Sequence, residues 1–186
     1  MISNEVKTGL RIEFDLSEGD SRSWDNLTRM VCFHNRYKLG DDHNYNKNDY
    51  NSFDELKEAI EEKETVLFIK PLYLYDHSGI TISTDTFNCN FDSGQIGWVY
   101  ITKELRDTLG VSDNDLEKQL IGEVETYDKE VRNDVYSFSC YKDDVLVDSC
   151  GGFYGADLKA NGMLEHIPDE FIKLLEDKNI TEVQID

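Results

Sequence analysis

The sequence contains no long hydrophobic run and very little proline. Proline accounts for only two of the 186 residues. The longest apolar stretches cover residues 66–69 and 72–75 and are separated by Lys70 and Pro71, whereas a membrane-crossing helix needs about 20 consecutive apolar residues. Residues 1–7 also lack the apolar segment of a secretory signal. We therefore expect a cytoplasmic protein.

Positive charge is scarce. The chain has 19 Lys and Arg against 39 Asp and Glu, which gives a formal net charge of −20. This charge disfavours unaided binding to DNA, RNA or an anionic membrane and favours a basic partner. Hydrophobic residues nevertheless make up 39% of the chain and aromatic residues 11%, enough for a packed core. The length predicts a single domain over residues 1–186.

Cysteine is sparse, and its spacing does not fit a metal centre. The four cysteines, at positions 32, 89, 140 and 150, include no C-x-x-C pair. Residues 113, 115 and 117 are acidic, which is the spacing of the first three ligands in an EF-hand calcium loop. However, Lys118 stands where that loop requires glycine. We expect reduced thiols, no metal site and no cofactor.

Apolar periodicity predicts the secondary structure. Strands are predicted at residues 10–16, 30–33, 66–75, 79–84, 96–101, 135–140 and 145–150, with a hairpin turn at residues 142–144 between the last two. Ser52 and Glu55 form a capping-box pattern that predicts a helix to residue 63. Further helices are predicted at residues 102–109, at residues 112–127 and after Pro168.

These elements form local hairpins rather than regular β-α-β units. They predict an α+β fold built on a mostly antiparallel sheet of six or seven strands, with three or four helices mainly on one face. Residues 39–52 are rich in Asn and Asp and are predicted to form a long polar loop. Residues 156–186 are a candidate C-terminal helical appendage.

Residues 76–78 read Asp-His-Ser, the three residue types of a catalytic triad. Neighbours on an extended chain point apart, so we favour a structural turn completed by Gly79. Cys150 precedes two glycines and has His77 as a conceivable base, although a cysteine that ends a strand is usually a small buried hydrophobe. The candidate residues of a functional turn or pocket are Asp76, His77, Ser78, Asp92, Trp98 and Cys150, with Cys89 as a further thiol.

Acidic residues gather in two stretches. Residues 104–148 contain 13 acids and 5 bases. The acids predicted to form a partner-binding surface are Glu117, Glu123, Glu125, Asp128, Glu130, Asp143 and Asp144. A second cluster decorates the first helix and comprises Asp54, Glu55, Glu58, Glu61, Glu62 and Glu64. Such surfaces suit the basic groove of a nucleic-acid-binding protein, and the alternative is that the charge serves solubility only.

Residues 72–84 read Leu-Tyr-Leu-Tyr-Asp-His-Ser-Gly-Ile-Thr-Ile-Ser-Thr. This block and residues 87–104 resemble a family of small acidic proteins from phages and mobile elements of Gram-positive bacteria. Segments 122–128, 133–136 and 148–155 fit the same pattern, so the resemblance covers about residues 66–155. The chain departs from the pattern at Asp85-Thr86, where a proline-containing turn is expected, and at Phe91 and Gly151, which replace tryptophan.

The resemblance implies a function in the conflict between mobile elements and their hosts. Small acidic proteins on such elements are often inhibitors of host defence, including anti-CRISPR and anti-restriction proteins that mimic DNA. It implies no catalytic residues. Our first hypothesis is therefore a non-enzymatic anti-CRISPR protein that binds a basic effector nuclease with its guide RNA and does not bind DNA itself. The alternatives are a small-molecule-binding protein or Cys/His-dependent enzyme centred on His77 and Cys150, and a structural module of the element.

Overall fold

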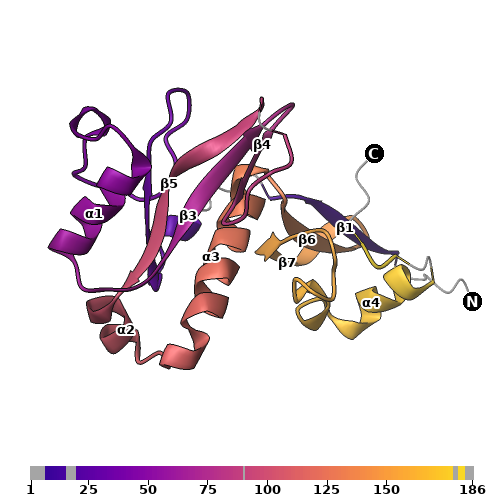
Figure 1. The fold of residues 1–186 in the computed structure, drawn as a ribbon. Helices are drawn as coiled ribbons and strands as arrows, with labels where there is room; N and C mark the ends of the chain where they lie inside the picture. Colours follow the sequence, from indigo (N-terminus) through magenta and orange to yellow (C-terminus); the bar gives the residue numbers. More distant parts are fainter. Residues whose placement is uncertain (1–6, 16–19, 90, 178–179, 183–186) are drawn as a thin grey trace, which may run out of the picture. The chain divides into compact units, whose positions relative to one another are not determined.

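The computed structural model describes residues 7–15, 20–89, 91–177 and 180–182 (Figure 1). The chain divides into two compact units. The central unit comprises residues 20–132, and the terminal unit comprises residues 1–19 and 133–186. Seven strands and four α-helices lie in the described residues, so the α+β class is confirmed. That the chain behaves as a single domain stays a prediction.

The central unit contains a four-stranded antiparallel sheet. Its strand order is β2 (Thr28–Cys32), β5 (Ser93–Thr102), β3 (Val66–Asp76) and β4 (Ile80–Ser83). β3 pairs with β5 along most of its length, but with β4 only from Tyr73 to Asp76. Pro71 therefore lies where β3 has a strand on one side only, which accommodates a residue without an N–H group.

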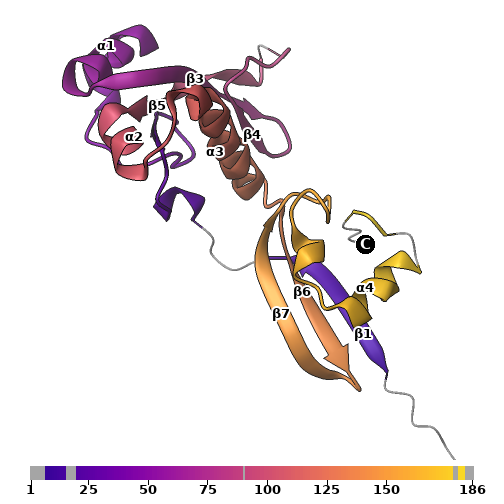
Figure 2. The same cartoon turned by 90° about the horizontal axis from the view of Figure 1, so that it is seen from below.

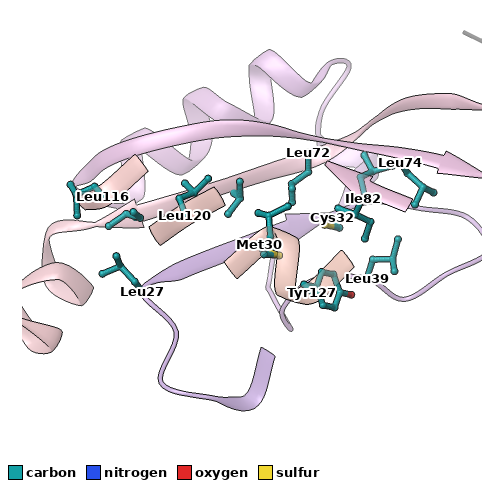
Figure 3. Packing of buried hydrophobic residues seen from close by; sticks show 14 residues of the cluster. Leu27, Met30, Cys32, Leu39, Leu72, Leu74, Ile82, Leu116, Leu120 and Tyr127 are labelled. Atoms are coloured by element: carbon teal, nitrogen blue, oxygen red, sulfur yellow. The ribbon is translucent and has the colours of Figure 1, made fainter. Parts of the chain in front are cut away.

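Helices cover both faces of this sheet. On one face, α3 (Leu116–Val131) packs Leu116, Leu120 and other apolar residues against Met30 and Leu72 (Figure 3). On the other face, α1 (Phe53–Lys63) packs against side chains that alternate with the first set, among them Trp98. Residues 96–101 are therefore all buried, as expected for a strand covered on both sides. The prediction that the helices lie mainly on one face is wrong for this unit.

The terminal unit contains a separate three-stranded antiparallel sheet. Its order is β1 (Thr8–Phe14), β6 (Val135–Lys142) and β7 (Val145–Tyr154) (Figure 2). The prediction of one sheet of six or seven strands is therefore wrong, because three strands form this second sheet. The helix α4 (Asp169–Glu176) and residues 158–167 cover one of its faces and share a hydrophobic core with β6. The candidate appendage is thus part of this unit's core.

Helix boundaries follow the sequence signals closely. Ser52 Oγ accepts a hydrogen bond from Glu55 N at the start of α1, and Thr102 Oγ1 accepts one from Leu105 N at the start of α2 (Lys103–Leu109). Pro168 directly precedes α4. Single-turn helices lie at Ser21–Ser23, Lys47–Asp49, Asp113–Asp115 and Met163–Glu165. No helix in the described part of the chain has both the length and the apolar character needed to cross a membrane.

Candidate functional site

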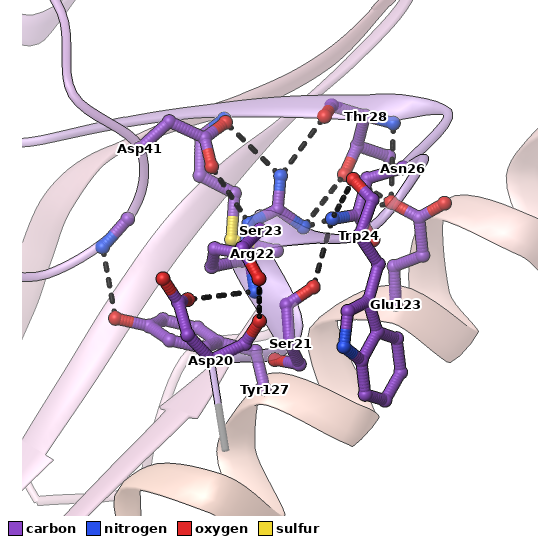
Figure 4. Close-up of polar contacts among 12 residues, drawn as sticks. Asp20, Ser21, Arg22, Ser23, Trp24, Asn26, Thr28, Asp41, Glu123 and Tyr127 are labelled. Carbon is purple, nitrogen blue, oxygen red and sulfur yellow. Dashed lines mark hydrogen bonds and ion pairs between the residues drawn. The ribbon is translucent and has the colours of Figure 1, made fainter. Parts of the chain in front are cut away.

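Two of the predicted surface acids of α3 hold the segment that leads into β2. Glu123 accepts hydrogen bonds from Leu27 N at 2.8 Å and Thr28 N at 3.1 Å, and its Oε2 lies 3.6 Å from Arg22 Nη1 (Figure 4). Glu130 accepts one from Ser21 N at 2.8 Å. Carboxylates placed in this way satisfy backbone donors that would otherwise lack a partner.

The other acids of α3 divide between structural and exposed positions. Asp128 accepts a hydrogen bond from Ile82 N at 2.7 Å and pairs with Arg132 at 3.3 Å. Glu117 pairs with Lys70 at 2.7 Å. Glu125 is exposed. Most of the α3 carboxylates thus bind other parts of the central unit, which makes this helix a poor match to a freely accessible polyanion.

Asp143 and Asp144 belong to the terminal unit, at the tip of the β6–β7 hairpin. Both are exposed and have positive φ angles of 49° and 63°. Asp143 Oδ1 accepts a hydrogen bond from Lys7 N at 2.9 Å, and Asp144 lies 3.8 Å from Lys7 Nζ. Their first role is therefore to build a tight turn of the primed type.

The carboxylates of α1 form an exposed acidic array on the central unit. Asp54, Glu55, Glu58, Glu61 and Glu62 are all exposed, while Leu56 and Ile60 are buried beneath them. Glu55 binds Asn51 N at 2.7 Å. The periodicity of α1 thus places its apolar residues on the sheet and its acids toward solvent.

The two lysines of α1 lie over aromatic rings of the central unit. Lys57 Nζ is 5.6 Å from the ring centroid of Trp98 and 3.7 Å from Glu61 Oε1. Lys63 Nζ is 4.4 Å from the ring centroid of Tyr45. Cation–π contacts hold a lysine on the ring face, so these cations are directed toward the rings.

The predicted functional turn does bring several candidate residues together. His77 Nδ1 lies 3.4 Å from Asp92 Oδ2, and Cys89 Sγ lies 3.6 Å from the same oxygen. Asp76 N donates to Asp92 O at 2.8 Å. The carboxylate thus stands between the thiol and the imidazole. A cysteine nucleophile needs the imidazole beside the thiol, so this order of groups does not suit Cys–His catalysis.

Asp76 and Asp92 also line a cavity of about 440 Å³. Arg36 pairs with Asp76, and Tyr37 donates a hydrogen bond to Asp76 Oδ1 at 3.3 Å. The cavity is also lined by Lys47, His34 and the rings of Phe33, Phe53 and Phe91. Burial, with help from Arg36 and Lys47, lowers the pKa of His34. No motif in the sequence indicates a role for Arg36, because the loop that carries it is recognisable only by its polar residues.

The remaining candidate residues are Ser78, Trp98 and Cys150. Ser78 occupies the β3–β4 turn with a φ of 58°, which supports the structural-turn interpretation. Trp98 is buried under α1, and its Nε1 donates to Phe53 O at 2.7 Å. Cys150 is exposed on β7 of the terminal unit. Each of these three residues has a local structural setting of its own.

Buried thiols in both units are held in the neutral form. Burial raises the pKa of Cys32 to about 12, with a further contribution from Asp41. It also raises the pKa of Cys140 to about 11. A thiol is nucleophilic as its thiolate, so neither of these two cysteines is suited to nucleophilic catalysis near neutral pH.

Within the described residues, no group of three or more His, Cys, Asp or Glu side chains is arranged to hold a metal ion. Comparisons of the chain with protein-family models, curated proteins and solved structures find no match.

Proposed function

We propose that the protein is an inhibitor, encoded by a phage or mobile element, of a host nucleic-acid-targeting defence system. Its target is a basic effector, a CRISPR nuclease with its guide RNA. The observation that carries the proposal is the exposed row of carboxylates on α1. This row replaces the α3 surface as the proposed contact, because the α3 acids are largely used inside the central unit.

The carboxylate density of α1 is close to that of a nucleic acid. Five exposed acids lie between positions 54 and 62, a helical distance of about 12 Å at 1.5 Å per residue. Duplex DNA carries about seven phosphates over the same axial distance. An array of this density can occupy a groove lined with Lys and Arg in place of DNA.

Charge reversal on α1 tests this proposal. The variant Glu58→Lys/Glu62→Lys changes two exposed residues one helical turn apart. The matched control, Glu165→Lys/Glu176→Lys, makes the same change in net charge at exposed positions of the terminal unit. In a plasmid-interference assay against a panel of guide-loaded CRISPR effectors, the wild-type protein and the control should protect the plasmid, whereas the α1 variant should not.

Salt dependence provides a second readout. Capture of the inhibited effector by the wild-type protein should weaken steeply between about 50 and 500 mM salt, because the attraction between exposed charges is screened. Full protection by the α1 variant would contradict the proposed contact. Failure of the wild-type protein against every effector in the panel would contradict the proposed function.

The cavity beside the β3–β4 turn supports a second candidate, a small-molecule-binding protein. Its supporting observation is that Asp76, Asp92 and Arg36 line one cavity, with His77 beside Asp92. Under this alternative, His77→Ala abolishes protection in the same assay while the urea unfolding midpoint stays unchanged. If the protein is instead a Cys/His-dependent enzyme, Cys150→Ala also abolishes protection at an unchanged urea midpoint. The α1 variant Glu58→Lys/Glu62→Lys remains active under either alternative.

A further inference from the structure

The strand β7 lies at an edge of the three-stranded sheet. Among the described residues it pairs with β6 on one side only, and its free edge is visible in Figure 2. Residues 145–152 are all exposed. The exposed fractions of Val145, Leu146 and Val147 are 63%, 53% and 49%. Three consecutive exposed aliphatic residues on a sheet edge favour pairing with another strand.

The geometry of the hairpin shows which backbone groups point outward. Asp143 and Asp144 form a two-residue turn, so the flanking pair Lys142–Val145 is the hydrogen-bonded pair nearest the turn. The next pair, Tyr141–Leu146, is then a non-hydrogen-bonded pair, whose backbone groups face away from each other. The N–H and C=O of Leu146 are thus directed to the free edge.

The register of β7 with β6 shifts between the pairs Tyr141–Leu146 and Cys140–Asp148, which leaves Val147 as an extra, bulged residue just after Leu146. Other common means of protecting an edge strand are few on β7. The strand contains no Pro, Lys or Arg, and its one charged residue is Asp148. Asp148 Oδ1 accepts a hydrogen bond from Ser149 N at 2.9 Å, and Asp15 Oδ2 accepts one from Gly152 N at 2.7 Å. These contacts satisfy N–H groups toward the end of β7 and leave its first half as the accessible edge.

The charge around this edge selects the partner. Asp143, Asp144 and Asp148 flank the three aliphatic residues, and Lys7 is the cation paired with Asp144. A second copy would bring a net charge of −20 and the same three acids against this edge. A strand that carries Lys or Arg beside aliphatic residues would complement it in both charge and apolar contact.

We propose that the edge of β7 at residues 145–148 binds an extended basic and aliphatic segment of a partner protein by adding it as a fourth strand to the sheet. Main-chain hydrogen bonds provide affinity in this mode of binding, and the alternating side chains provide selectivity. The surface belongs to the terminal unit, and it is independent of the α1 carboxylates.

A fluorescently labelled, end-capped heptapeptide of alternating Lys and Val is the probe. Fluorescence anisotropy should show saturable binding to the full-length protein. The same peptide with N-methylated valines keeps its charge but loses backbone donors, and it should bind at least about tenfold more weakly. A capped peptide of alternating Glu and Val should not bind.

Variants of the protein locate the site. Leu146→Pro removes the outward N–H group without changing charge, and its matched control Leu146→Thr keeps that group; only the proline variant should lose about tenfold or more in affinity. Asp144→Asn/Asp148→Asn should weaken binding and reduce its salt dependence. Should Leu146→Pro fail to fold, the N-methylated peptide tests the same hydrogen bonds on the wild-type protein.

Three results would overturn the proposal. These are equal binding of the N-methylated peptide, absence of binding up to about 1 mM peptide, and a dimer in sedimentation analysis that Leu146→Pro dissociates. The last result would give the edge to a second copy instead. Glu58→Lys/Glu62→Lys should leave peptide binding unchanged, so this experiment and the test of the proposed function fail independently.

Discussion

Arg22 and Asp41 form a partly buried two-point ion pair in the central unit. Arg22 Nε lies 2.8 Å from Asp41 Oδ1, and Arg22 Nη2 lies 3.0 Å from Asp41 Oδ2. The Arg22 side chain is only 5% exposed and also donates to the Thr28 carbonyl, while Asp41 Oδ2 accepts a hydrogen bond from Met30 N (Figure 4). The pair therefore fastens the segment before β2 and the polar loop after it to the same strand.

Arg22→Lys should lower the free energy of unfolding by about 1.5–3 kcal/mol, because an ammonium group cannot replace the planar two-point contact with the partly buried Asp41. The exposed Arg29 on β2 provides the control, and Arg29→Lys should change stability by less than about 0.5 kcal/mol. Urea unfolding followed by tryptophan fluorescence measures both. Equal stability of the two variants would contradict a structural role for the pair.

Glu123→Gln should destabilise the protein by about 1.5–3 kcal/mol, since Leu27 N and Thr28 N bind different oxygens of the carboxylate, the amide keeps only one acceptor oxygen, and it no longer attracts Arg22. Glu125→Gln on the same helix removes an exposed carboxylate and should be nearly neutral. Urea midpoints for the two variants distinguish a structural acid from a surface acid. A neutral Glu123→Gln would return this residue to the list of candidate contact acids.

Local signals in the sequence predicted the elements well, whereas the assembly of the sheets could not be predicted. Ser52, Thr102 and Pro168 mark helix starts through contacts within three or four residues. Strand pairing depends on residues far apart in the chain: Thr8 lies opposite Lys142. Alternating polarity identifies a strand and its buried face but does not identify the neighbouring strand. The sequence therefore predicts a single sheet where the structure has two.

The candidate sites show the same limit. The acids of α3 have the sequence pattern of a solvated helix face, but the backbone donors that they bind come from Ser21, Leu27 and Thr28, about 100 residues away. Only the folded arrangement shows that these carboxylates are occupied. Asp76 and Asp92 were both singled out, and they do meet, because β3 and β5 are neighbouring strands that bring their ends together.

Gly97→Ala should destabilise the central unit by about 3 kcal/mol or more. A Cβ at position 97 would collide with the backbone of Val31 and Cys32 on the neighbouring strand, and overlap with backbone atoms is relieved only by moving the strand. Gly94 lies on the same strand, β5, and a Cβ added there would meet no atom within 4 Å, so Gly94→Ala should cost less than about 1 kcal/mol. Thermal unfolding of both variants gives the comparison, and similar losses would contradict this close strand contact.

Asp144→Gly should stabilise the terminal unit by about 0.5–1 kcal/mol. Asp144 has a φ of 63° at the second turn position, where glycine has no steric penalty and Asp-Gly is a favoured pair. Asp144→Val should destabilise instead, because a β-branched side chain strongly disfavours positive φ. Hydrogen exchange of the β6 amides would report both effects, and a loss of protection in the glycine variant would contradict this turn geometry.

Stability should fall as the pH rises above about 9. Burial raises the pKa of Cys32 from 9.0 to about 12 and that of Tyr127 from 10.0 to about 12. Above pH 9 the unfolded chain therefore loses a proton from Cys32 that the folded chain retains, and above pH 10 the same holds for Tyr127, so the free energy of unfolding decreases. Below pH 9 both states keep these protons, and neither group contributes a pH dependence.

Cys32→Ala removes the first of these titrations. Its stability curve should be flatter than that of the wild-type protein between pH 9 and 10, by about 1.4 kcal/mol per pH unit at most. Urea unfolding at closely spaced pH values measures the slope, and the difference between the two proteins at pH 8 gives the separate cost of the lost packing. Parallel curves from pH 8 to 11 would mean that Cys32 ionises equally easily in both states, contrary to its burial between β2 and α3.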